Sequence, residues 1–147
     1  MLHELQSNPS YFFAFFAFAV VWVGGFMFWG KKRVDSIFQG IEISKEIFRE
    51  KRASGYSKKS VITRIGGARN ALDIIVTDTD LCIKGIFLPF SVIGLFYDLT
   101  LRIKLSDIVE ITPEGKEVEV VFSNDKGARS IVLKMKNIDQ FVHAIKG

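Results

Sequence analysis

A long hydrophobic run without any charge covers residues 11–29, from Tyr11 to Trp29. As an α-helix rising about 1.5 Å per residue, this run would be about 28 Å long, close to the ~30 Å hydrocarbon core of a bilayer. Its two ends are aromatic, and amphipathic rings favour the membrane interface. A buried core helix of this composition would need a much larger soluble protein around it. The pattern therefore predicts a transmembrane helix over residues 11–30, after a short extracytoplasmic N-terminus of residues 1–10.

A helical pattern of apolar residues follows the predicted span, over residues 31–53. Apolar side chains recur every three or four positions, and charged residues occupy the opposite face. Gly40 is the one weak position, costing about 1 kcal/mol relative to Ala. The following domain, the membrane surface or a second copy could cover the apolar stripe, which is too short to establish a coiled coil. With the polar stretch 53–60 as a linker, residues 31–60 are predicted to form a basic amphipathic juxtamembrane segment.

From residue 61 onward, apolar and polar residues alternate with the period of two that is typical of strands. Turn residues interrupt the alternation at 78–80, 112–115 and 124–127. The alternating apolar positions are Leu72, Ile74, Val76, Leu81, Ile83, Leu99, Leu101, Ile103, Leu105, Val118, Val120, Phe122, Ile131, Leu133 and Met135. This pattern predicts an antiparallel barrel or sandwich in which each strand is exposed to solvent on one side.

The chain closes with a segment that is predicted to be an amphipathic helix. Asn137 can cap it, and Gln140 supplies a capping-box partner three residues later. The apolar residues of this segment form a one-sided stripe. We expect the helix to cover an open end or face of the preceding sheet.

An uncharged, apolar connection covers residues 86–97. Pro89 and Gly94 argue against one continuous helix or central strand, and a solvent-exposed loop would be more polar. We expect the connection either to fold back onto the domain core or the juxtamembrane helix, or to dip into the bilayer surface. Folding back is the default, because exposed apolar patches of this size are uncommon. The residues that would contact the bilayer are Phe87, Leu88, Phe90 and Ile93.

The net charge of +4 conceals a strong asymmetry along the chain. Residues 31–69 hold eleven Lys and Arg against four Asp and Glu, whereas residues 70–147 hold nine against eleven. The ten N-terminal residues contain no Lys or Arg. The positive-inside rule therefore predicts an N-terminus outside and a C-terminal domain in the cytoplasm. A cleaved signal peptide would need a basic start, a shorter apolar stretch and a small-residue cleavage site, none of which the sequence has.

The residues contain no recognisable catalytic or metal-binding constellation. The single cysteine, Cys82, is expected to be a small buried hydrophobe. His3 and His143 lie far apart in the sequence, and His143 is expected to face solvent. Gly66-Gly67 lacks the Lys-Ser/Thr of a phosphate-binding loop and is expected to be a turn. We therefore expect no enzyme, no cofactor and no metal site.

Three stretches resemble the pleckstrin-homology-like superfamily, and most closely its GRAM-like and bacterial members. Residues 71–83 (ALDIIVTDTDLCI) are similar to its strand–turn–strand signature, and residues 103–108 (IKLSDI) to a step between strands. Residues 131–141 are similar to its last strand and helix. The resemblance covers residues 61–147 and implies a curved, partly open barrel of about seven strands, capped by the C-terminal helix. The expected fold class is thus mainly β with helices. The family implies membrane-surface or protein binding rather than catalysis.

Two functional hypotheses follow for this membrane-anchored chain. In the first, the cytoplasmic domain is a binding or scaffolding module for a protein partner, with self-association left open. In the second, the domain is a lipid-surface module that contacts anionic lipid through its basic segment and the 86–97 connection, since each cation near such a surface contributes about 1 kcal/mol. Nucleic acid is not expected, because no base-stacking aromatic pattern accompanies the basic residues. The candidate anionic-lipid contacts are Lys31, Lys32, Arg33, Lys58, Lys59, Arg64, Arg69 and, if the strands pair as expected, Lys84.

Overall fold

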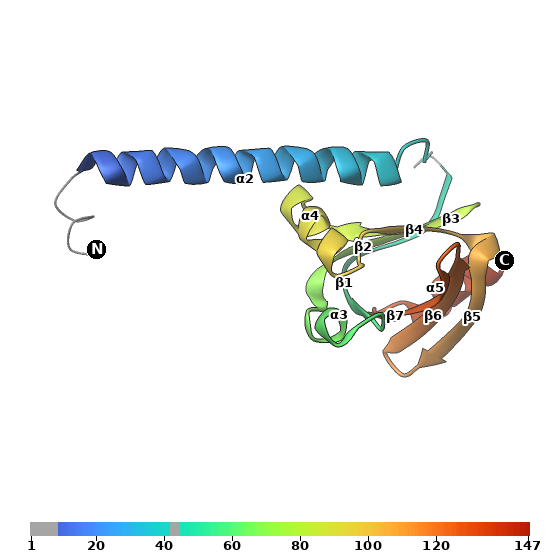
Figure 1. Ribbon diagram of the computed structural model, residues 1–147. Helices are drawn as coiled ribbons and strands as arrows, with labels where there is room; N and C mark the ends of the chain where they lie inside the picture. The colour runs from blue at the N-terminus through green and yellow to red at the C-terminus, as the bar shows by residue number, and fades with distance from the viewer. Residues whose placement is uncertain (1–8, 42–44) are drawn as a thin grey trace.

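The computed structural model describes residues 9–41 and 45–147, which form one long helix, a seven-stranded sheet and three short α-helices (Figure 1). The helices are α2 (Pro9–Ile37), α3 (Val61–Ile65), α4 (Leu88–Phe96) and α5 (Ile138–Lys146). The strands are β1 (Glu46–Ser57), β2 (Ala68–Thr77), β3 (Asp80–Gly85), β4 (Leu101–Lys104), β5 (Ile108–Glu114), β6 (Glu117–Asn124) and β7 (Gly127–Lys134). A 3-10 turn, Leu105–Asp107, joins β4 to β5.

All strand pairs are antiparallel, in the order β4-β3-β2-β1-β7-β6-β5. The predicted apolar positions form one buried core, and β6 shows the predicted alternation of more and less buried residues. The most buried members of that core include Ile74, Leu81, Ile83, Val118, Val120, Ile131 and Leu133. The prediction that each strand is exposed to solvent on one side is wrong for β2 and β3, where Asp73, Ile75 and Cys82 on the other face are buried as well; α4 packs on β3 at this part of the sheet. The described residues contain no ladder between the outer strands β4 and β5, so the pairing does not show a closed barrel.

Helix α5 packs across this sheet, against β1, β2 and β5. Phe141 is completely buried and meets Phe48 of β1 edge to face, with the ring centroids 5.7 Å apart. The predicted C-terminal helix is therefore confirmed, but its predicted capping box is not. The side chain of Asn137 makes no cap hydrogen bond. Instead, the Glu50 carboxylate of β1 accepts from the backbone N–H of Lys136 (2.6 Å) and of Asn137 (3.0 Å).

The predicted juxtamembrane helix over residues 31–53 is wrong beyond its first two turns. Helix α2 ends at Ile37, and Gly40 adopts a φ of +78° that turns the chain away from the helix axis. Residues 42–44 lie outside the described residues. Residues 46–57, predicted as helix and linker, form β1 at the centre of the strand order. Hydrogen-bonded pairing with both β2 and β7 outweighs the weak three-to-four spacing of apolar residues. The burial follows the strand period instead, since Phe48 and Glu50, two residues apart, are buried on the same side.

Two further predictions in the domain are wrong for local reasons. The segment after Val61, predicted as the first strand, is α3. It begins with a capping box in which Ser60 and Thr63 exchange side-chain and backbone hydrogen bonds. The 86–97 connection contains the continuous helix α4, because Pro89 stands in its first turn, where a backbone N–H has no helical partner anyway.

Candidate membrane-contact site

Helix α4 is fixed on the sheet by hydrogen bonds and by close backbone contacts. The Ser91 hydroxyl donates to the Gly85 carbonyl (3.1 Å), and the Thr100 hydroxyl donates to the Ser91 carbonyl (2.6 Å). The Leu99 N–H donates to the Gly94 carbonyl (2.8 Å). Both glycines are needed for this approach, since a Cβ on Gly85 would overlap the Ser91 nitrogen, and one on Gly94 would lie 2.5 Å from the Thr100 hydroxyl. The helix therefore has one fixed orientation on the domain.

The C-terminal end of α4 is joined to three other elements. Asp98, with a φ of 57°, accepts from the Ser57 hydroxyl (3.2 Å) at the end of β1 and from Arg129 Nη1 (3.2 Å) on β7. The Tyr97 ring lies directly over Gly66, where any Cβ would overlap it. Gly66 is the C-cap of α3, so the ends of the two short helices meet at this point.

Helix α4 also packs against the C-terminal part of α2 (Figure 1). Val92 is completely buried, and a Cβ on Gly30 of α2 would lie 2.6 Å from Val92 Cγ2 and closer still to Cγ1. The rings of Phe26 and Phe96 stack, with centroids 5.8 Å apart and planes at 21°. Phe26 belongs to the apolar run 11–29, and Gly30 follows that run directly. Helix α4 is therefore level with the end of the apolar run.

Apolar side chains of α4 that do not face the sheet are exposed, and so is Phe87, the residue just before the helix. Phe87 is 65% exposed, Phe90 and Ile93 are each 47% exposed, and Leu88 is 38% exposed. Phe96 adds a fifth side chain, 59% exposed. The expectation that the connection folds back is confirmed, because α4 packs on the sheet and on α2. The four residues predicted to contact the bilayer are nevertheless exposed, so contact with the bilayer stays a prediction.

The predicted basic contacts fall into separate groups. Lys31, Lys32 and Arg33 are exposed on α2 directly after the apolar run, and Lys32 Nζ lies 4.8 Å from the centroid of the Phe28 ring. Lys84 of β3 lies apart from the residues around α3, with its Nζ 6.0 Å from the Phe38 ring centroid. Lys84 was predicted to lie near the other basic candidates if the strands paired as expected, whereas the register pairs it with Asp73 in the middle of β2.

The remaining basic candidates surround α3. Lys59, Arg64 and Arg69 are exposed. Lys58 instead forms an ion pair with Glu119 of β6, with 2.7 Å between Nζ and Oε2. This pair and the hydroxyl of Ser130 lower the pKa of Glu119 below its ordinary value. Lys58 is thus partly neutralised by Glu119. The other three side chains, Lys59, Arg64 and Arg69, form no ion pair among the interactions described.

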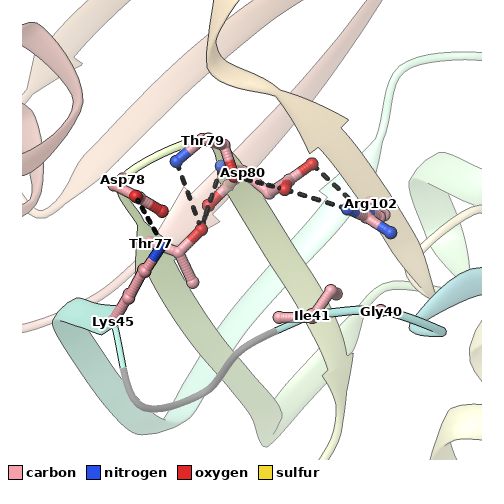
Figure 2. A pocket seen from close by; sticks show the side chains of 8 residues that line it. All are labelled: Gly40, Ile41, Lys45, Thr77, Asp78, Thr79, Asp80 and Arg102. Carbon is pink, nitrogen blue, oxygen red and sulfur yellow. Dashed lines mark hydrogen bonds and ion pairs between the residues drawn. The ribbon is translucent and has the colours of Figure 1, made fainter.

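A second attachment between α2 and the domain was not predicted from the sequence. A small pocket of about 150 Å³ lies between the segment after α2 and the β2–β3 turn, and its lining side chains are drawn in Figure 2. Arg102 of β4 makes a two-point contact with Asp80 (2.9 and 3.0 Å), and its Nη1 donates to the Gln39 carbonyl (2.9 Å). Lys45 pairs with Asp78 at 3.7 Å. The guanidinium of Arg102 lowers the pKa of Asp80. Together with α4, this attachment sets the direction of α2 relative to the sheet.

Helix α2 is long and apolar enough to cross a membrane, and the rest of the chain does not bury its most apolar stretch. The predicted N-terminal segment 1–10, with His3, lies almost wholly outside the described residues. Cys82 is buried as predicted, and burial raises its pKa to about 11. His143 is exposed, also as predicted. No protein-family model and no curated protein matches this sequence.

Proposed function

We propose that this chain is a single-pass membrane protein whose N-terminus lies outside and whose pleckstrin-homology-like, GRAM-like domain is held against the cytoplasmic face of the bilayer by α4. The observation that carries the proposal is the position of α4. Its exposed apolar face stands beside the end of the apolar run of α2, where a spanning helix leaves the hydrocarbon. The proposal selects the lipid-surface hypothesis over the protein-partner hypothesis.

The stacked rings of Phe26 and Phe96 give the depth of this contact. Phe26 stands three residues before Trp29, which is about 4.5 Å along the helix axis. If α2 spans the membrane with Trp29 at the interface, Phe96 lies at the boundary between headgroups and hydrocarbon. Aromatic side chains favour that boundary, and Lys31, Lys32 and Arg33 then lie level with the headgroup phosphates.

The energetic argument concerns the exposed side chains of α4. A large apolar side chain gains roughly 1.5–3 kcal/mol when it leaves water completely. Helix α4 and Phe87 together expose five such side chains within ten residues, and a concentration of exposed apolar side chains on a fixed element is typical of an interaction surface. Because α4 is hydrogen-bonded to the sheet, immersing this face would also orient the whole domain on the membrane.

A depth measurement on the full chain tests this proposal. In a Cys82→Ala background, a nitroxide label would be attached at Ile93→Cys and, as a matched control, at Val109→Cys. Val109 is 68% exposed on the outer strand β5. In phospholipid vesicles, collisions with oxygen report lipid, and collisions with a water-soluble nickel chelate report water. We expect lipid exposure at position 93 and water exposure at position 109. Equal access of the nickel chelate to both labels would refute the docking of α4.

The protein-partner hypothesis has one observation in its favour. Strand β5 is the last strand in the sheet order, and Val109 is exposed on it. In Figure 1 this strand lies at the end of the domain away from α4. Lipid contact through α4 would therefore leave the β5 edge facing the cytoplasm, where a partner could add a strand. If Val109→Lys abolished binding of a protein partner while the depth of the label at position 93 stayed unchanged, partner binding at β5 would be a role separate from lipid contact through α4.

A further inference from the structure

The short helix α3 presents three aliphatic side chains to solvent that the fold does not use. Val61 is 70% exposed, Ile62 is 74% exposed and Ile65 is 83% exposed. Their orientation is fixed, because Thr63 between them is buried and its hydroxyl donates to the Ser57 carbonyl (3.0 Å). The capping box with Ser60 holds the first turn. A rigid turn that holds its largest apolar side chains outward is typical of a contact surface.

Helices α3 and α4 lie at the same end of the domain. In Figure 1 both stand at the end that points back along α2 toward its N-terminus, while β5 and the C-terminus lie at the other end. The contact of Tyr97 with Gly66 joins the two helices. A groove of about 310 Å³ continues this surface between them, and its lining includes Gly67, Phe90 and Ile93. Helices α3 and α4 are therefore neighbours at this end of the domain, and the groove between the C-cap of α3 and α4 is partly apolar.

The charge of the surroundings indicates which surface α3 would meet. Lys59 precedes the helix, Arg64 lies within it and Arg69 opens the following strand, and all three are exposed. By contrast, the exposed residues of β5 include Glu110 and Glu114. Apolar side chains surrounded by cations match an anionic bilayer, where the former enter the interface and the latter lie at the phosphates.

We propose that α3 is a second membrane-contact element, which inserts Val61, Ile62 and Ile65 into the interface of an anionic leaflet while Lys59 and Arg64 lie at its phosphates. This inference rests on the docking of α4, because α2 and α4 bring α3 to the level of the interface. It adds a lipid preference that α4 alone, whose exposed face is uncharged, does not supply. The domain then touches the membrane through two helices rather than one.

The test uses full-length chains labelled at Ile62→Cys, with Ile93→Cys and Val109→Cys as references, in the Cys82→Ala background. Each is reconstituted in vesicles of phosphatidylcholine alone and of equal parts phosphatidylcholine and phosphatidylglycerol. We expect the label at position 62 to be exposed to lipid in the anionic vesicles. Each of Lys59→Gln and Arg64→Gln should lower the ratio of immersed to free α3 about fivefold, which is about 1 kcal/mol per cation. Added salt should weaken the same contact.

The outcomes separate this inference from the docking of α4. Lipid exposure at position 93 with water exposure at position 62 in both vesicles would overturn the inference and leave the proposed function intact. Water exposure at both positions would overturn both. Equal immersion of position 62 in the two vesicles, unchanged by Lys59→Gln and Arg64→Gln, would overturn the lipid preference. Immersion confined to anionic vesicles and reduced by both substitutions would support the inference as stated.

Discussion

The contact between Gly30 and Val92 allows a direct test of how the domain is attached to α2. Any β-carbon on Gly30 would lie 2.6 Å from one γ-carbon of Val92 and closer to the other. Val92 cannot yield easily, because it is completely buried and its β-branched side chain has one strongly preferred rotamer in a helix. Gly30→Ala must therefore push α4 away from α2. Overpacking of this kind costs about 1–3 kcal/mol, equivalent to a roughly 5- to 150-fold lower docking constant.

Gly24→Ala on the same helix is the matched control. A Cβ on Gly24 has no neighbour within 4 Å, so this substitution raises helix propensity, by about 1 kcal/mol, without a clash. Val92→Ala removes both clashing γ-carbons and should restore docking when it is combined with Gly30→Ala. The expected order of docking is therefore Gly24→Ala first, the double variant second and Gly30→Ala last.

Cross-linking of Phe26→Cys to Phe96→Cys with a short bifunctional thiol reagent measures docking, because the two rings stack with their centroids 5.8 Å apart, so these positions face each other. Cys82 does not compete, since it is buried and burial raises its pKa to about 11. We expect the cross-linking rate in vesicles to fall with Gly30→Ala and to stay unchanged with Gly24→Ala. Equal rates for the two single variants would refute the packing of α4 on α2, and with it the depth assigned to Phe96.

Three further predictions concern the domain itself. Glu50→Ala should lower the free energy of unfolding by about 3 kcal/mol, because two backbone amides before α5 lose a charged acceptor. Glu50→Gln should lower it less. An unchanged midpoint of chemical denaturation in detergent would contradict this prediction. Arg102 holds the pKa of Asp80 below its ordinary 3.8, so the pair stabilises the fold above that value and ceases to do so as pH falls through the lowered pKa. Asp80→Asn should flatten the acid limb of a stability–pH curve, and an unchanged limb would exclude this pair as its cause. A thiol reagent at pH 8 should modify Cys82 only after unfolding, so rapid modification of the folded chain would show that this strand opens.

Much of the fold could be predicted because it follows from local periodicity. An uncharged run of helical length, the strict alternation from Val118 to Phe122, and the one-sided stripe before the C-terminus each predict their own element and its buried face. The hairpin between β6 and β7 was signalled by its turn residues. These features need no information about distant residues.

The errors occur where a distant partner decides the conformation. Residues 46–53 were predicted as helix, yet they belong to β1, in which Glu50 is buried and its carboxylate accepts from two amides 86 and 87 residues away. The 86–97 connection was predicted not to form one helix, although Pro89 in the first turn of α4 permits it. Lys84 was predicted to lie near the other basic candidates, but the strand register places it opposite Asp73, with its ammonium group over the Phe38 ring just after α2.

In the candidate site too, some features follow from local sequence and others depend on distant residues. The sequence alone determined that an apolar span, a basic segment and an uncharged apolar connection occur in one chain, because composition and charge are local properties. Only the tertiary structure decided that Phe96 stacks on Phe26, that α3 holds Ile62 and Ile65 outward, and that α3 and α4 share one end of the domain. Such contacts depend on strand register and on glycines that let backbones approach, at Gly30 and Gly85 above all. No local pattern of hydrophobic and polar residues encodes which distant surfaces those glycines will meet.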